Sequence, residues 1–89
     1  MNINKIIETS EVMNIAWMCL DISQYTKHDV FFDYSPIKNT FSVKIYRGGY
    51  HTDRSPEVFY DVFFNTYKED SEKIARIVKT LKSLYGDEQ

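Results

Sequence analysis

Two histidines and one cysteine are the side chains of this sequence best suited to metal binding or nucleophilic chemistry. His28 and His51 are far apart, and neither has a second donor at a metal-ligand spacing, although Asp53 lies near His51 in a glycine-containing loop. A metal site needs three or four converging donors, so we expect no metal and an exposed His51. Cys19 lies in an apolar helical segment, which predicts a buried, unreactive thiol, and a single cysteine excludes an internal disulfide and favours a reducing cytosol.

Three aspartates fall on outward positions of predicted strands, and a pair of them could support acid–base chemistry: Asp29, Asp33 and Asp61. Such chemistry needs a concave pocket that excludes water, and an open three-stranded sheet offers little of one. No serine lies in a nucleophile motif, and Gly48-Gly49 lacks the lysine and the spacing of a phosphate-binding loop. We therefore expect no enzymatic activity and no cofactor.

Helical periodicity predicts a first helix over residues 3–25. One of its faces follows steps of three and four residues and is expected to be buried: Ile3, Ile6, Ile7, Met13, Trp17 and Leu20. A second set of apolar residues widens that buried face: Val12, Ile15, Ala16, Cys19 and Ile22. Thr9-Ser10-Glu11 interrupts the apolar pattern, so either Ser10 caps a new helix or one helix runs through it. We favour the single helix.

A second helix is predicted near the end of the sequence. Asp70 or Ser71 caps it, acidic residues in its first turn and lysines in its last turn complement the helix dipole, and Gly86 is placed to end it. Its buried stripe is expected to be Ile74, Ile77, Val78, Leu81 and Leu84.

Three strands are predicted between the helices, over residues 28–34, 41–46 and 58–64. The clearest alternation, in residues 41–46, assigns Phe41, Val43 and Ile45 to the core. Residues 35–40 contain Pro36 and Asn39 and read as a turn, and residues 47–57 form the longest loop. The third strand is apolar on both sides, which is typical of a strand that lines a contact surface or is covered twice.

Short connections favour an antiparallel meander in strand order 1-2-3. Two helices then pack across one face of the sheet, and the whole of residues 1–89 forms one α+β domain, a two-layer sandwich of order α-β-β-β-α. Aromatic residues make up 16% of the chain and also occupy the strand positions that face away from the helices. The open face of the sheet must therefore meet solvent or a partner.

We expect the partner-binding residues to lie on this open face and on the adjoining loop. They are Phe31, Asp33, Lys44, Tyr46, Phe59, Asp61 and Phe63 on the strands, with Tyr50 and Arg54 in the loop. Aromatic residues ringed by charge are typical of protein interfaces. The alternatives are a homodimer seam, rings that shield one another across the strands, and rings that stack nucleic-acid bases.

Nucleic-acid binding is the alternative function suggested by element order. The order helix, three strands, helix resembles the double-stranded-RNA-binding domain, but residues 70–76 are mixed in charge and the turn at residues 35–40 lacks that family's Gly-Pro and histidine. The net charge of −2 supports neither a polycation nor an acidic nucleic-acid mimic. Four basic residues could contact phosphates or simply solvate a helix face: Lys73, Arg76, Lys79 and Lys82.

Three features together resemble small phage and prophage proteins of Gram-positive bacteria. They are a buried first helix, the run His28-Asp29-Val30-Phe31-Phe32-Asp33-Tyr34-Ser35-Pro36, and the run Phe41-Ser42-Val43-Lys44-Ile45-Tyr46 followed by Gly48-Gly49. That family has no settled activity. The opening Met1-Asn2-Ile3-Asn4, the length and the element order are also similar to a prophage anti-CRISPR inhibitor of a type II Cas nuclease, which is far more acidic, so none of its contact residues is carried over.

Small size, the absence of catalytic motifs and the aromatic open face, taken with this resemblance, predict a non-enzymatic phage-type accessory protein that binds and modulates or inhibits a host protein, such as a CRISPR nuclease. A nucleic-acid-binding module and a structural homodimer are the alternatives. We expect a host-cell cytoplasmic location without a signal peptide, because the start of the chain leads into no continuous apolar stretch. No membrane partner is expected, because the longest apolar cluster, residues 15–20, is too short to cross a bilayer.

Overall fold

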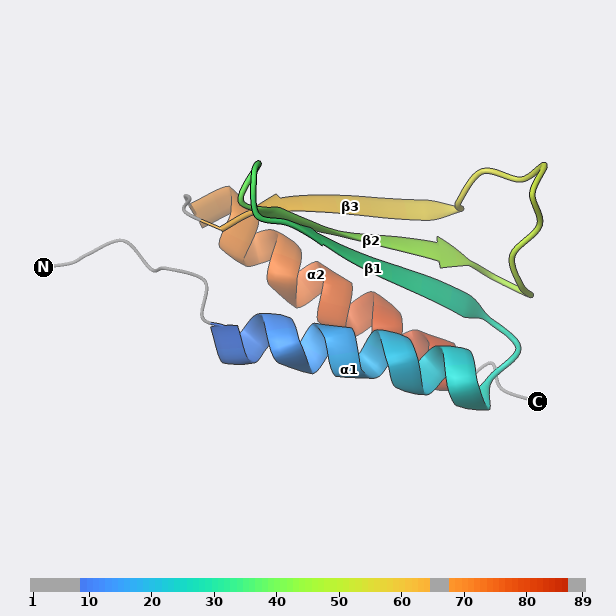
Figure 1. The fold of residues 1–89 in the computed structure, drawn as a ribbon. Helices are drawn as coiled ribbons and strands as arrows, with labels where there is room; N and C mark the ends of the chain where they lie inside the picture. Colours follow the sequence, from blue (N-terminus) through green and yellow to red (C-terminus); the bar gives the residue numbers. More distant parts are fainter. Residues whose placement is uncertain (1–8, 65–67, 87–89) are drawn as a thin grey trace, which may run out of the picture.

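The computed structural model describes residues 9–64 and 68–86 and has the predicted element order. Helix α1 (Thr9–Tyr25) is followed by strands β1 (Asp29–Ser35), β2 (Thr40–Tyr46) and β3 (Val58–Phe63) and by helix α2 (Lys68–Tyr85). The strands form one antiparallel sheet in the order β1-β2-β3. Both helices lie on the same side of this sheet (Figure 1), which confirms the α+β sandwich with one layer of helices.

The central strand, β2, carries the middle of the core. Its residues Phe41, Val43 and Ile45 have no exposed surface, as their alternation predicts. The turn before β2 places Asn39 at a φ of 57°, a left-handed conformation that asparagine tolerates better than most residues. The strand ends where Gly48 and Gly49 adopt φ values of 80° and 113°, which a side chain would strain. The predicted strand boundaries are therefore correct to within about one residue, the precision expected for strand ends.

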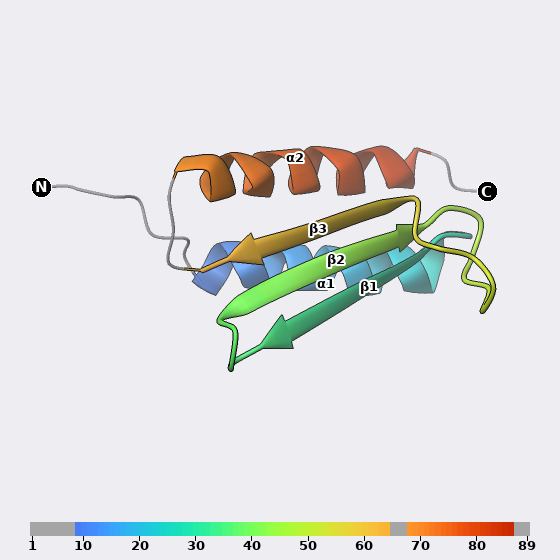
Figure 2. The same ribbon diagram turned by 90° about the horizontal axis from the view of Figure 1, so that it is seen from above.

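Helix α2 packs its predicted stripe inward and runs beside β3 (Figure 2). Ile77, Leu81 and Leu84 are fully buried. The predicted cap at Asp70 or Ser71 is wrong, because α2 begins at Lys68 and both residues are helical. Acidic residues also stabilise the first turn of a helix, so the acidic run there is equally consistent with an earlier start. The helix ends at Tyr85, one residue before Gly86, as predicted.

Helix α1 faces the sheet with a different stripe from the one expected. Its buried residues are Val12, Ile15, Met18, Cys19 and Ile22. Four of these belong to the set predicted only to widen the buried face; Met18 belongs to neither predicted set, and Ala16 of the widening set is half-buried. Met13, Trp17 and Leu20, predicted to lead that face, are 61%, 59% and 59% exposed. Both sets follow helical spacing, so the spacing alone does not decide which of them faces β1 and α2. The remaining expected members, Ile3, Ile6 and Ile7, lie outside the described residues.

Side-chain hydrogen bonds join the helices to each other and to the sheet. The Tyr85 hydroxyl donates to Asp21 Oδ2 at 2.7 Å and so links α2 to α1. The hydroxyls of Tyr60 on β3 and Thr80 on α2 lie 3.2 Å apart. These links hold both described helices against one face of the sheet, and neither α1 nor α2 lies on the opposite face.

Candidate interaction surface on the open face of the sheet

The face of the sheet that points away from both helices, called the outer face below, is built from four rows of residues that run across the strands. The register gives the first row as Asp29 and Tyr46, the second as Phe31, Lys44 and Phe59, the third as Asp33, Ser42 and Asp61, and the fourth as Ser35, Thr40 and Phe63. Neighbours within a row lie about 5 Å apart, close enough for their side chains to interact. All seven strand residues predicted to bind a partner lie in these rows.

Three aromatic rings form a cluster at the end of the outer face nearest the β2–β3 loop. The ring centroids of Phe31, Tyr46 and Tyr50 are 5.0 to 5.5 Å apart with steep interplanar angles, the edge-to-face geometry that aromatic rings favour. Asp29 Oδ2 accepts a hydrogen bond of 2.8 Å from the Tyr50 backbone N–H, which folds the loop back over the strands. Tyr46 is therefore only 7% exposed, so it supports this cluster from beneath while Phe31 and Tyr50 present its surface.

Strand β3 presents the most exposed rings of the outer face. Phe59 and Phe63 are 56% and 49% exposed and flank Asp61 along the strand. Helix α2 packs against the opposite side of β3, where the Tyr60 hydroxyl lies 3.2 Å from the Thr80 hydroxyl. Large apolar side chains at this level of exposure, gathered on one face, are typical of a surface that a partner covers.

Three charged side chains lie between these rings. Among the described residues, Asp33, Lys44 and Asp61 form no ion pair with their side chains, although Lys44 lies in the row next to both aspartates. The cation is flanked by Phe31 and Phe59, and the two carboxylates are separated by Ser42. The outer face thus alternates a bulky row that carries one positive charge with a small row that carries two negative charges.

Arg54, the remaining predicted contact residue, holds the β2–β3 loop in shape. Its Nη2 atom lies 2.7 Å from Glu57 Oε2, and its guanidinium also donates to the backbone carbonyls of Gly49 and Arg47 at 3.3 and 3.4 Å. Any contact that Arg54 makes with a partner is therefore secondary to this role in positioning Tyr50.

The two outer strands have part of their free edges capped by helix side chains. Ser23 Oγ on α1 accepts from the Val30 N–H at 2.9 Å and donates to the Val30 carbonyl at 3.2 Å. Lys73 Nζ on α2 donates to the Asp61 carbonyl at 3.0 Å. Both caps occupy backbone groups that an added strand would use, so the outer face is a better docking surface than either edge.

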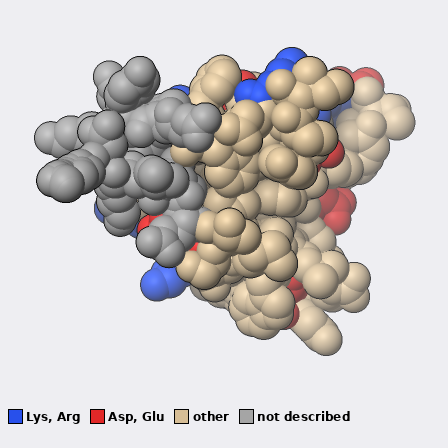
Figure 3. Space-filling view, turned by 60° about the vertical axis from the view of Figure 1, so that its left-hand side comes forward, with Lys and Arg blue, Asp and Glu red and all other residues tan. Residues whose placement is uncertain are grey.

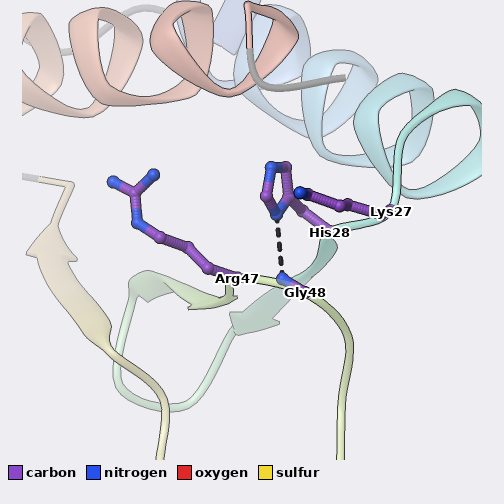
Figure 4. A pocket seen from close by; sticks show the side chains of 4 residues that line it. All are labelled: Lys27, His28, Arg47 and Gly48. Carbon is purple, nitrogen blue, oxygen red and sulfur yellow. Dashed lines mark hydrogen bonds between the residues drawn. The ribbon is translucent and has the colours of Figure 1, made fainter. Parts of the chain in front are cut away.

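An open pocket at the end of the sheet brings together Lys27, His28, Arg47 and Gly48 (Figure 4). The imidazole of His28 is 3% exposed, and its Nδ1 atom accepts a hydrogen bond of 2.9 Å from the Gly48 N–H. This bond joins the residue just before β1 to the turn after β2. The spacing of the two histidines in the sequence does not reveal this structural role. His51 is exposed, as predicted, and lies outside this pocket.

A second apolar surface, which sequence analysis assigned to the core, lies on α1 at Met13, Trp17 and Leu20. In the view of Figure 3, most of the described surface is uncharged, and lysine, arginine and acidic side chains appear in separate small groups. The part of this side that the described residues form carries no continuous basic patch of the kind that nucleic-acid-binding surfaces present.

Cys19 is buried, as predicted, and burial raises the pKa of its thiol to about 12. No group of three or more potential metal-ligating side chains gathers within residues 9–64 and 68–86. None of the described helices is long and apolar enough to span a membrane. No family model, no curated protein and no solved structure matches this chain.

Proposed function

We propose that this protein is a non-enzymatic binding module and that a protein partner docks on the outer face of its sheet. The observation that supports this function is the exposure of Phe31, Phe59 and Phe63 on a face that neither helix covers. Covering apolar surface releases about 25 cal/mol for each Å² removed from water, and aromatic rings supply most of the binding energy in many interfaces. The resemblance to phage proteins suggests a host protein that is modulated or inhibited, such as a defence nuclease.

Charge makes a nucleic acid the weaker candidate for this face. Stacking of bases on Phe59 and Phe63 would bring phosphates close to Asp61, while Lys44 is the one lysine or arginine in the four rows. Nucleic-acid affinity depends mainly on neutralising phosphates with several cations. Of the basic residues on α2, Lys73 already donates to the Asp61 carbonyl on the edge of β3.

The proposal is tested by comparing two substitutions of equally exposed aromatic residues. Phe59→Ala removes a ring that is 56% exposed on the outer face, and Trp17→Ala removes one that is 59% exposed on α1. We expect a protein captured in stoichiometric amount from a Gram-positive bacterial lysate to be lost with Phe59→Ala, by a tenfold or greater weakening, and retained with Trp17→Ala. Binding of the purified partner is then measured by calorimetry.

Equal capture by the two variants would contradict docking on the outer face, and capture lost only with Trp17→Ala would transfer the function to α1. A parallel titration with duplex RNA at low salt addresses the alternative. Salt-sensitive binding that weakens with Lys79→Glu would favour nucleic acid over protein.

A further inference from the structure

We infer that the outer face pairs with the outer face of a second copy of this chain, in a dimer whose two-fold axis crosses the strands beside Val43. This inference concerns the same outer face and rests on the proposal above that this face is a docking surface. It is derived from the order of large and small, and of positive and negative, side chains in the four rows of the outer face.

The two middle rows differ in size. The second row contains Phe31, Lys44 and Phe59, and the third contains Asp33, Ser42 and Asp61. Every position in the second row is thus larger than its neighbour two residues along the same strand in the third row. If two copies of this face meet with their large rows opposite each other, gaps remain between their small rows. If the large row of each copy lies over the small row of the other, the side chains fill the space evenly.

A two-fold axis that lies between the faces and runs across the strands brings the large row of each copy onto the small row of the other. The axis passes between the second and third rows, and the residue of β2 between those rows is Val43. Phe31 then lies over the partner's Asp33, Lys44 over the partner's Ser42, and Phe59 over the partner's Asp61. The end that carries Tyr46 and Tyr50 meets the opposite end of the partner, where Ser35 and Thr40 are small. Phe63, the large member of that fourth row, meets the partner beside the first row, where β3 has no residue.

The same axis gives each charged group an opposite charge. Lys44 faces a serine whose row neighbours are the partner's Asp33 and Asp61, each about 5 Å away across the strands. Among the described residues, Lys44, Asp33 and Asp61 form no ion pair within one copy. In the dimer, the second copy supplies the opposite charge for each of them. Because the axis repeats every contact, two such clusters form in the dimer.

An axis parallel to the strands is disfavoured by the same residues. It would place Lys44 on the partner's Lys44 and Asp33 on the partner's Asp61, and it would press the large rows together while the small rows stayed apart. Like charges that face each other across an interface destabilise it. The row order therefore selects one of the two face-to-face arrangements.

The size of the face sets the strength expected of the dimer. The strands have 7, 7 and 6 residues, so the face covers roughly 300 Å² in projection. Stable interfaces usually bury about 800 Å² on each partner. We therefore expect a weak, reversible dimer that a larger protein partner can displace.

The first experiment measures association by sedimentation velocity from low micromolar to about millimolar protein. Wild-type protein should associate as its concentration rises. Lys44→Glu and the double variant Asp33→Lys/Asp61→Lys should each weaken self-association at least about tenfold, because each gives positions 33, 44 and 61 charges of one sign. The control is Lys79→Glu, which makes the same charge change at an exposed position on α2 and should associate like the wild type.

The decisive experiment mixes the Lys44→Glu protein with the double variant Asp33→Lys/Asp61→Lys. The Lys44→Glu protein has acidic residues at positions 33, 44 and 61, and the double variant has lysine at all three. We expect the mixture to form a one-to-one dimer that neither forms alone and that weakens as salt is raised. Variants that misfold would show it by circular dichroism and would not regain association on mixing.

The axis is tested with a spin label on Lys38→Cys, in the turn at the small-row end, mixed with isotope-labelled wild-type protein. Cys19 is 2% exposed and does not compete for the label. With the axis across the strands, the label should broaden amide signals of Gly49 and Tyr50 in the other copy. Broadening of Ser35 and Asn39 instead would favour the parallel axis and overturn this arrangement.

A wild-type chain that stays monomeric at the highest concentration, together with a mixture that forms no dimer, would overturn the inference. The proposed function fails separately, through equal capture of a protein partner by Phe59→Ala and Trp17→Ala. Loss of capture with Phe59→Ala in a monomeric protein would keep the function and assign the outer face to a different protein.

Discussion

Tyr85 makes the hydrogen bond that most directly links the two helices. Its hydroxyl donates to Asp21 Oδ2 at 2.7 Å, and burial, followed by this bond and the nearby negative charge, raises the pKa of Tyr85 to about 12. A group whose pKa is raised on folding holds its proton more tightly in the folded state, so its contribution to stability is complete below the ordinary tyrosine value. That contribution is lost as the pH rises from about 10 to about 12.

Tyr85→Phe should therefore lower the free energy of unfolding by about 1–2 kcal/mol at neutral pH, because Asp21 loses a donor. It should also make the alkaline fall in stability shallower between pH 10 and 12. Denaturant unfolding of both proteins across this range measures the effect. Cys19 is present in both proteins, so its own fall above the ordinary thiol pKa cancels in the difference, apart from its charge interaction with Tyr85. Parallel curves would contradict the role assigned to this hydroxyl.

The thiol of Cys19 should react slowly with thiol reagents while the protein is folded. Its side chain is 2% exposed and its pKa is raised to about 12 by burial, and thiolate is the reactive form. We expect a thiol reagent at neutral pH to modify the folded protein at least about a hundredfold more slowly than the protein in denaturant, since modification requires opening. A rate close to that of the unfolded chain would show that α1 detaches readily from the sheet.

At the level of elements, Ser23 is the connection between α1 and the edge of β1. One hydroxyl satisfies both the N–H and the carbonyl of Val30. Ser23→Ala should cost about 1–3 kcal/mol in the free energy of unfolding, because both backbone groups lose their partner. Hydrogen exchange of the Val30 amide should also accelerate. Ser83→Ala, which removes a hydroxyl bonded within α2 at 2.6 Å, is the matched control and should leave Val30 exchange unchanged.

The elements differ in how well their sequence predicts their packing. In β2, alternate residues face opposite sides, so the pattern identifies Phe41, Val43 and Ile45 as buried without further information. In α1, apolar residues surround most of the helix, and two overlapping stripes both satisfy helical spacing. Which stripe is buried depends on how closely α1 can approach β1 and α2, a property of the assembled layers. The spacing of α1 therefore predicts a buried Trp17, although its side chain is exposed.

The sequence predicts which face of the sheet carries the exposed rings, but it does not predict how the loop covers part of that face. The alternation of the strands places Phe31, Phe59 and Phe63 opposite the core. The burial of Tyr46 was not predictable, because it depends on Tyr50, which the loop returns to the sheet through a backbone bond to Asp29. The role of His28 was also hidden, since its partner is the backbone N–H of Gly48, 20 residues away.

For the whole molecule, stability and binding should reside in different residues. Leu81→Ala on α2 should cost about 2–5 kcal/mol in the free energy of unfolding, because Leu81 is fully buried. Phe59→Ala should change stability by less than about 1 kcal/mol, since its ring is already largely in water. Thermal unfolding of both variants measures this contrast. A large loss of stability with Phe59→Ala would show that the ring serves the fold and would weaken the case for a docking surface.

The caps that Ser23 and Lys73 place on the two outermost strands limit how this protein can aggregate. Stacking of strands into a fibril needs uninterrupted rows of available amide and carbonyl groups along an exposed border. At Val30 and Asp61 those groups are already taken by the chain's own side chains. A concentrated solution of this aromatic-rich domain should therefore produce complexes of limited size and resist the open-ended growth that leads to insoluble filaments.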